Sequence, residues 1–293
     1  MATSPELEGV LPVDKPVGPT SHDVVARARR ALRLRRIGHT GTLDPFASGL
    51  LLLCLGRATR VAEYLSALPK TYLARMRLGQ ATDTDDLTGA VSAESERWRD
   101  LGEGDVRAAL GRRTGPQLQV PPAFSAKKQA GERLYERARR GEAVAPAAVE
   151  VVVHELRLLS WEPPFASFET TCSSGTYIRA IARDAGADLG VGAHLVELRR
   201  TAVGRWRVQD ALPLEQVRPE GVADVLTPTL RALDHLPLVT LLPEAVADIR
   251  HGRAVTVAAP DAPAVALADG DALVAIGRVS AGRAYPRKVF LDA

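Results

Sequence analysis

The loop of residues 36–45, Arg-Ile-Gly-His-Thr-Gly-Thr-Leu-Asp-Pro, constrains the fold of this chain more than any other segment. Its two glycines permit a tight turn and a close approach by another molecule. The loop ends in one carboxylate, Asp44, and Pro45 keeps that residue out of helical geometry. The apolar run of residues 50–55 follows and predicts a buried strand. We therefore expect one carboxylate on a rigid loop beside a core strand, although an aspartate before a proline often only caps a turn.

Strand-like and helical patterns are mixed along the rest of the chain. The spacing of apolar residues predicts helices at about 22–35, 59–68, 104–113, 131–140 and 176–189. Alternating or continuous apolar runs predict strands at about 9–14, 50–55, 71–78, 149–160, 165–173 and 195–203. Glu162-Pro163-Pro164 joins two of these strands in a predicted hairpin. This mixture predicts an α+β (mixed α/β) fold built on a mixed sheet.

The composition changes near residue 238, which predicts a second domain. Residues 213–237 are rich in proline and acidic residues, and we interpret them as a linker. Valine and alanine dominate from about residue 238, and no long helix is evident. That pattern is typical of a small all-β module. We therefore expect one domain over residues 1–237, linker included, and another over residues 238–293.

Arginine is unevenly distributed. The net charge is only +3, but the sequence pI is about 9.0, and six arginines fall between Arg27 and Arg36. The planar guanidinium suits phosphate better than a lysine ammonium does. A nucleic-acid partner is therefore favoured over a membrane or an acidic small molecule, while a solvated helix face rich in arginine remains the alternative.

The sequence shows no clear motif for a disulfide, a metal site, a nucleotide cofactor or a membrane segment. Cys54 and Cys172 lie in apolar runs, as buried thiols of a reducing compartment do. Neither has a cysteine or histidine at metal-ligand spacing, so we expect no metal, and no glycine-rich nucleotide motif indicates a cofactor. No signal peptide and no apolar stretch of roughly 18 residues is present, which favours a cytoplasmic protein.

An acidic turn precedes Gly89 and contains Asp83, Asp85 and Asp86. Neighbouring carboxylates can serve acid–base chemistry or hold a cation. Because the pattern lacks the glycine and the distal glutamate of a calcium loop, we interpret these residues as turn chemistry.

Several separated segments together resemble the bacterial TruB-type tRNA pseudouridine synthases, which isomerise the uridine of the TΨC loop at position 55. These segments occur in the family's order and cover about residues 9–205: Asp14-Lys15-Pro16, residues 38–45, Lys70-Thr71-Tyr72, residues 78–80 and 82–85, residues 121–127, residues 174–179, and residues 192–200. The resemblance implies a pseudouridine synthase core with a central mixed, largely antiparallel sheet flanked by helices. The terminal module is similar to a PUA RNA-binding domain, on a looser match.

The resemblance also implies roles for individual residues. Asp44 matches the essential aspartate, Arg179 the arginine paired with it, and Tyr72 the aromatic residue that stacks on the target base. Substrate contacts are implied for Tyr72, His39, Tyr177 and Leu198. Contacts to the RNA backbone are expected from Arg35, Arg36, Lys127 and Arg200. The implied partner is the T arm of tRNA, and the enzyme is expected to act as a monomer with no cofactor, membrane or protein partner.

Elementary chemistry is consistent with this reading. Replacing an N-glycosidic bond by a C-glycosidic bond requires no redox step, and one arginine can hold a buried carboxylate ionised. A uridine in a folded loop must be extruded, and an aromatic face can replace its lost stacking, which is worth about 1–3 kcal/mol. An RNA-binding protein without turnover and a guide-RNA-dependent relative are the alternatives. The sequence also leaves open whether Asp44 attacks C1′, adds to C6 of the base or removes a sugar proton.

Overall fold

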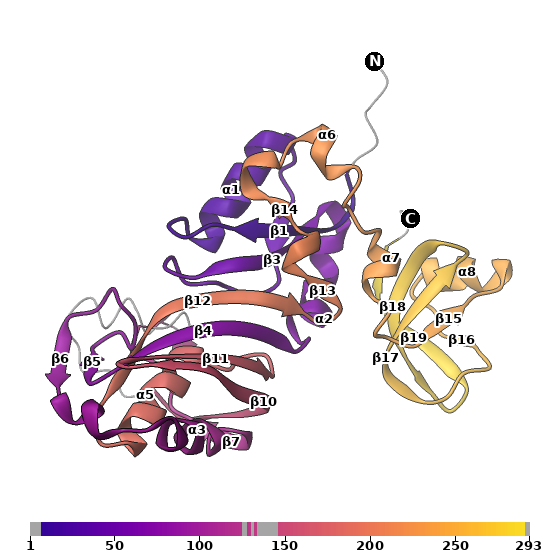
Figure 1. Cartoon of the computed structure of the whole chain (residues 1–293). Helices are drawn as coiled ribbons and strands as arrows, with labels where there is room; N and C mark the ends of the chain where they lie inside the picture. The colour runs from indigo at the N-terminus through magenta and orange to yellow at the C-terminus, as the bar shows by residue number, and fades with distance from the viewer. Residues whose placement is uncertain (1–6, 125–127, 130–131, 134–145, 291–293) are drawn as a thin grey trace.

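The computed structural model of the protein describes residues 7–124, 128–129, 132–133 and 146–290. A ten-stranded sheet forms its main body (Figure 1). The strands of this sheet are β1 (Gly9–Lys15), β2 (Ile37–His39), β3 (Ser48–Leu55), β4 (Lys70–Leu78), β7 (Gly115–Gln119), β10 (Val149–Glu162), β11 (Phe165–Cys172), β12 (Ala193–Val203), β13 (Trp206–Arg207) and β14 (Leu212–Pro213). Their order is β14-β1-β3-β12-β4-β11-β10-β7, with β13 paired to β12 and β2 paired to β3.

Two of the pairs in this sheet are parallel, β1 with β14 and β3 with β12, and its other pairs are antiparallel. The predicted mixed, largely antiparallel sheet is therefore confirmed. The hairpin of β10 and β11 is also present at the predicted place. The strand predicted at about 9–14 is β1; the short segment before Lys15-Pro16 would suit an edge strand, but β1 lies between β14 and β3.

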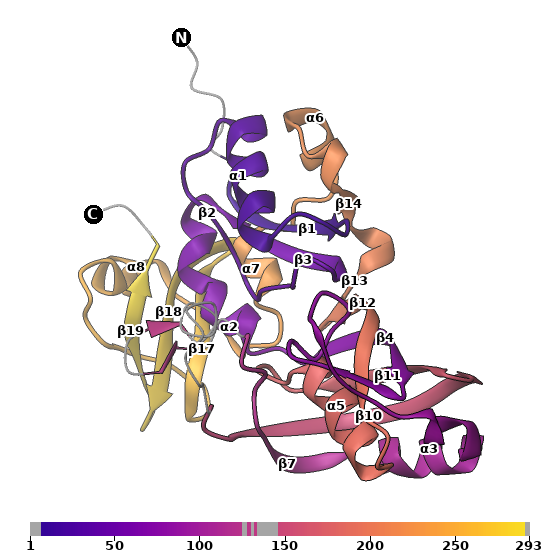
Figure 2. The ribbon, with the colours of Figure 1, turned by 90° about the vertical axis from the view of Figure 1, so that its left-hand side faces the viewer.

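Helices pack at both ends of the sheet (Figure 2). Their bounds are α1 (Ser21–Leu32), α2 (Ala62–Ser66), α3 (Glu103–Gly111), α5 (Ile178–Asp188), α6 (Pro219–Val222) and α7 (Thr229–Ala232). Short 3-10 turns are η1 (Gly56–Val61), η2 (Glu96–Asp100), η3 (Val208–Asp210) and η4 (Leu214–Gln216). Small two-stranded ribbons pair β5 (Gln80–Thr82) with β6 (Val91–Glu94) and β8 (Lys128–Gln129) with β9 (Glu132–Arg133).

The apolar run in β3 is buried on both faces of the sheet, which explains why it does not alternate. Leu50, Leu52 and Cys54 pack into one apolar cluster. Leu51 and Leu53, on the opposite face, pack beneath α1 in another cluster. A strand covered on both faces needs apolar side chains at every position.

The predicted helix at 22–35 is present, but it ends three residues early. Thr20 caps its start, and Thr20 and Asp23 form a reciprocal capping box. Arg33 at the end of the helix has a φ of 52°, a left-handed conformation that stops the helix after Leu32.

The other predicted helices vary in accuracy. Those at 104–113 and 176–189 are confirmed as α3 and α5. The one at 59–68 is divided between η1 and α2. The helix predicted at 131–140 lies outside the described residues, apart from the two-residue strand β9.

The linker predicted at residues 213–237 is wrong, because this segment is folded onto the sheet. Leu212 and Pro213 form the strand β14 beside β1, and Thr227 bridges to Val10. Val222 and Ala232 are fully buried. The apolar residues that fall among its prolines and carboxylates pack against the main body. The composition of the segment therefore did not predict its packing.

A five-stranded sheet forms the C-terminal part, with the order β15-β17-β18-β19-β16. Its elements are β15 (Leu238–Thr240), α8 (Pro243–Arg250), β16 (Val255–Thr256), β17 (Ala262–Asp269), β18 (Ala272–Ser280) and β19 (Arg283–Val289). The expectation of an all-β module is thus wrong in one respect, since α8 starts at a proline and buries Ile249. Its eight residues are too few to stand out as a helical pattern in the sequence.

The C-terminal part lies beside α2 in both views (Figures 1 and 2). Ile276 and Phe290 share an apolar cluster with residues of β1 and β3. Arg57 donates to the carbonyl of Phe290 at 2.6 Å, and Arg60 donates to that of Val289 at 2.5 Å. The two parts are therefore joined by a common core as well as by polar contacts.

Candidate active site

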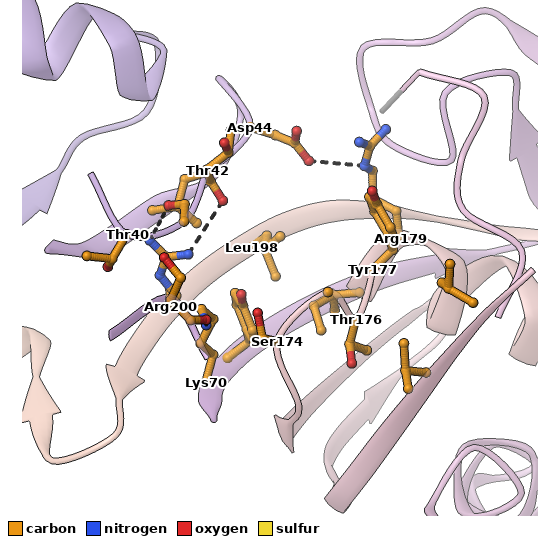
Figure 3. Close-up of a pocket in the computed structure, with 18 of the residues that line it drawn as sticks. Thr40, Thr42, Asp44, Lys70, Ser174, Thr176, Tyr177, Arg179, Leu198 and Arg200 are labelled. Atoms are coloured by element: carbon orange, nitrogen blue, oxygen red, sulfur yellow. Dashed lines mark hydrogen bonds and ion pairs between the residues drawn. The ribbon is translucent and has the colours of Figure 1, made fainter. Parts of the chain in front are cut away.

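A cavity of about 510 Å³ opens between the Asp44 loop, β4, β12 and the N-terminus of α5 (Figure 3). Its lining includes six of the site residues that the sequence analysis named: Asp44, Tyr72, Tyr177, Arg179, Leu198 and Arg200. Residues far apart in the sequence thus meet at one hollow.

An ion pair joins Asp44 to Arg179 across this cavity. The Nε of Arg179 lies 3.1 Å from Oδ2 of Asp44 (Figure 3). The Arg179 side chain is only 5% exposed, whereas that of Asp44 is 36% exposed because it borders the open cavity. The carboxylate is therefore oriented by a buried cation and remains accessible to a ligand.

Asp86 is a second carboxylate partner of Arg179, which the sequence analysis missed. Its Oδ2 lies 3.3 Å from Nη1 of Arg179, and its side chain is 6% exposed. Its Oδ1 accepts hydrogen bonds from the hydroxyls of Thr84 and Thr88 and from the backbone N–H of Thr88. We interpreted the acidic turn as turn chemistry, and these bonds are of that kind, but the turn also holds the active-site arginine.

Two backbone carbonyls complete the surroundings of Arg179. The guanidinium donates to the carbonyl of Thr84 at 2.8 Å and to that of Phe124 at 3.0 Å. Its position is thus fixed by partners from three separate segments of the chain, and it cannot turn without breaking several contacts at once.

The environment of Asp44 shifts its acidity. Burial raises the pKa of this carboxyl above its ordinary value of 3.8; the positive charge of Arg179 opposes that shift, nearby Asp86 adds to it, and Lys15 opposes it. The desolvation of the carboxylate outweighs its attraction to the two cations. A raised pKa means that the ionised form is lost, as pH falls, earlier than for a carboxyl in water.

The loop that carries Asp44 is held by the buried residues Ser21 and Arg200. The Ser21 hydroxyl accepts from the N–H of Leu43 at 2.8 Å and donates to its carbonyl at 3.2 Å. The Arg200 guanidinium donates to the carbonyls of Leu50 at 2.7 Å and Gly41 at 3.1 Å. Both side chains act on backbone, so they fix the path of the loop.

The expectation that Arg200 contacts the RNA backbone is therefore corrected. This side chain is 2% exposed and its guanidinium is engaged by carbonyls of the chain itself. Charge in the sequence could not distinguish a buried structural arginine from a surface one. Arg35 and Arg36 are exposed, whereas Lys127 lies outside the described residues.

Tyr72 lies on β4 and forms part of the cavity wall. The residue is 7% exposed, and burial raises the pKa of its phenol, a shift that the neighbouring Arg200 opposes. It shares an apolar cluster with Leu43, Phe46 and Leu198, which continues beneath the Asp44 loop. The cavity thus combines an aromatic wall with a carboxylate, a suitable arrangement for a planar ring.

His39 is near the cavity but is not among the residues that line it. Its ring packs edge-on against that of His22, with centroids 5.4 Å apart and an angle of 87°. Its Nδ1 accepts a hydrogen bond from the N–H of Gly41 at 3.3 Å. Burial lowers its pKa to about 4, and the charges of His22 and Arg200 act in the same direction. The ring is therefore neutral at neutral pH and carries its proton on Nε2.

Two buried lysines near the site were not given a role by the sequence analysis. Lys15 is fully buried and donates to the carbonyls of Pro16 and Pro19, both at 2.9 Å. Lys70 borders the cavity and donates to two carbonyls at the end of α2, both at 2.8 Å. Burial lowers the pKa of each amine to about 8.

Other kinds of site find little support in the part of the chain that the structure describes. No group of three or more histidine, cysteine, aspartate or glutamate side chains within it is placed to hold a metal ion. Among the described helices, none has the length and apolarity needed to cross a membrane.

Comparison with known proteins agrees with the geometry. The N-terminal domain of TruB family pseudouridylate synthases matches residues 29–178, and the C-terminal domain of tRNA pseudouridylate synthase B matches residues 179–236. The chain belongs to the TruB family of pseudouridylate synthases. It is accordingly an isomerase.

Individual relatives cover most of the chain. A protein named tRNA pseudouridine synthase B from Thermobifida fusca is 42% identical over 97% of this chain and 98% of its own length. The protein of that name from Gloeobacter violaceus is 49% identical over 72% of this chain and 73% of its own length. A crystal structure of a Cbf5-Nop10-Gar1 complex contains a chain that is 30% identical, with a TM-score of 0.76, covering 97% of this chain and 85% of that one.

We expect Asp86→Asn to lower the rate of pseudouridine formation by about tenfold or more, because Arg179 then loses one of its two carboxylate partners and no longer orients Asp44. Single-turnover kinetics at saturating RNA measures this rate. Asp83→Asn is the matched control, since Asp83 lies in the same turn and accepts from the N–H of Ala90 without an ion pair to Arg179. Equal rates for the two variants would show that Asp86 serves the turn only.

Proposed function

We propose that this chain converts the T-loop uridine of tRNA, position 55, to pseudouridine, acting on a base that has been flipped out of the folded loop. The observation that carries the proposal is the Asp44–Arg179 pair at the edge of a cavity walled by Tyr72. The relatives named tRNA pseudouridine synthase B support tRNA as the substrate.

We assign the catalytic roles to Asp44, Arg179 and Tyr72. The reaction breaks the bond between C1′ and N1 and forms a bond between C1′ and C5. The proton on C5 is lost and N1 gains one, so product and substrate are isomers. Asp44 supplies the carboxylate for this exchange, whichever of C1′, C6 or a sugar proton it engages. Arg179 orients that carboxylate and favours its ionised form, and the ring of Tyr72 faces the detached uracil while it rotates.

We assign substrate binding to Tyr72, Tyr177 and Leu198 in the cavity and to His39 beside it. Flipping a base out of a folded loop costs stacking, which an aromatic side chain can restore. The neutral His39 presents an N–H on Nε2, and such a donor can hold an exposed base or phosphate of the remodelled loop. No residue in this set requires a metal or an organic cofactor for its part.

We further propose that residues 1–237 form the catalytic domain and residues 238–293 a PUA-like RNA-binding domain. The β-rich sheet that begins at Leu238 agrees with this division. Arg35 and Arg36 are exposed, so they are available to contact the RNA backbone. The enzyme would act in the cytoplasm as a monomer, without a protein partner.

Two alternative functions predict a different result when the protein is incubated with tRNA. A protein that only binds RNA would need no oriented carboxylate in a cavity. A guide-dependent enzyme would be inactive on tRNA without added components. Purified protein alone with an unmodified tRNA transcript therefore distinguishes the proposed enzyme, which forms product, from both alternatives, which do not.

We expect the purified protein to form one pseudouridine in the T loop of such a transcript, with EDTA present. Asp44→Asn should abolish turnover and leave tRNA binding within about threefold, because the charge acts along the reaction path while the shape is kept. Primer extension after carbodiimide treatment maps the product, and filter binding measures affinity. Turnover by Asp44→Asn at a tenth of the wild-type rate would remove Asp44 from its assigned role.

The RNA-backbone assignment predicts a specific salt dependence. Each phosphate contact to RNA of single-stranded character contributes about −0.7 to the slope of log K against log salt. We expect Arg35→Ala/Arg36→Ala to make that slope shallower by about 1.4 if each arginine neutralises one phosphate. The control is Arg99→Ala/Arg107→Ala, since these exposed arginines pair with Glu96 and Glu103. An unchanged slope in the first variant would mean that its arginines only face solvent.

A further inference from the structure

The last residue of β7, Gln119, presents a buried amide to which the reaction assigns no role. The residue is 1% exposed. Its Oε1 accepts a hydrogen bond from the backbone N–H of Tyr177 at 2.8 Å, and its Nε2 donates to the backbone carbonyl of Tyr177 at 3.1 Å. One side chain therefore satisfies both backbone groups of a single residue, as a neighbouring strand would.

The residue held in this way sets the start of α5. Tyr177 is the N-cap of that helix, with extended backbone angles of φ −97° and ψ 111° and no hydrogen bond from its own side chain to the helix. Arg179 follows two positions later, in the first turn of the helix. Since a helix is stiff, displacement of the Tyr177 backbone carries Arg179 with it.

The residues after Gln119 continue along the same end of α5. Arg183 donates to the carbonyl of Val120 at 2.9 Å, and Arg179 donates to that of Phe124 at 3.0 Å. Those two contacts depend on arginines that also pair with carboxylates. The Gln119 contact, in contrast, is made by an uncharged side chain of β7 to the backbone of Tyr177. It can therefore be removed by mutation without changing any charged residue of the site.

We propose that Gln119 is a positioning residue for the isomerisation, because its clamp on the Tyr177 backbone determines where Arg179 meets Asp44. This inference rests on the proposed function of the site. The chemistry selects glutamine: the clamp needs a donor and an acceptor at one planar end of a long side chain. Glutamate lacks the donor, and leucine lacks both groups.

The test compares Gln119→Leu and Gln119→Glu with Gln117→Glu. Gln117 is the matched control, since it lies on the same strand and its Nε2 donates to the carbonyl of Arg113 at 2.5 Å, outside the cavity lining. Single-turnover rates are measured with a saturating unmodified tRNA transcript, and affinities by filter binding. We expect Gln119→Leu to lose about tenfold or more in rate, with affinity within about threefold. Gln117→Glu should stay within about twofold of wild type in both.

The glutamate variant adds a pH signature that a general loss of stability would not produce. Burial raises the pKa of a glutamate above its ordinary value of about 4.3, so it takes up a proton at a higher pH than a glutamate in water does. The protonated carboxyl can donate to the Tyr177 carbonyl and restore the clamp. Wild type and the glutamate variant share the other charged groups at this end of α5, so the titration of those groups cancels in the ratio of the two rates. These groups are Arg179, Arg183 and their partners Asp44, Asp85, Asp86 and Asp184. That ratio, wild type over Gln119→Glu, should therefore fall toward one at low pH.

A ratio for Gln119→Glu that stays constant with pH would overturn the proposal, as would a Gln119→Leu rate within about threefold of wild type. If Gln119→Leu does not fold, the glutamate variant decides alone. Wild-type protein that leaves the transcript unmodified would contradict the proposed function instead, so the two failures are distinguishable.

Discussion

A single buried guanidinium, that of Arg179, organises the candidate active site. It lies 3.1 Å from Asp44 and 3.3 Å from Asp86, and it also binds the carbonyls of Thr84 and Phe124. A cation that is 5% exposed is costly to bury unless its hydrogen-bonding groups are satisfied, and here four partners satisfy them. Because three of these partners come from outside the Asp44 loop, the orientation of the carboxylate depends on the whole fold around α5.

The sheet brings the two members of the ion pair together. The Asp44 loop enters β3, which pairs in parallel with β12, while Arg179 lies in the first turn of α5, which packs beneath β12 and β4. The β3–β12 junction is close: a Cβ on Gly49 would lie 2.3 Å from the carbonyl oxygen of Arg200, and the φ of Gly49 is +105°. Only glycine tolerates both conditions, so the strand pairing and the loop position are specified together.

The sequence predicts this site unevenly, for physical reasons. Local patterns were sufficient for α1 and β3, whose caps and apolar runs lie within one segment, and the family resemblance indicated Asp44, Tyr72 and Arg179. Long-range polar contacts leave no local pattern, so the sequence indicates only a turn around Asp86 and gives no signal for Gln119. Arg200 was assigned to RNA because charge alone does not reveal burial. The polar composition of the segment before residue 238 predicts a linker, although its few apolar residues suffice to pack it.

The central claim is that Arg179 favours the ionised form of a carboxylate that burial disfavours. Carbon-13 NMR of labelled aspartate, with Asp44→Asn used to assign the resonance, measures the pKa of Asp44 directly. We predict a pKa above 3.8 in the wild-type protein and a higher one in Arg179→Gln, where burial acts without the opposing charge. A wild-type pKa at or below 3.8, or one that Arg179→Gln leaves unchanged, would contradict the account.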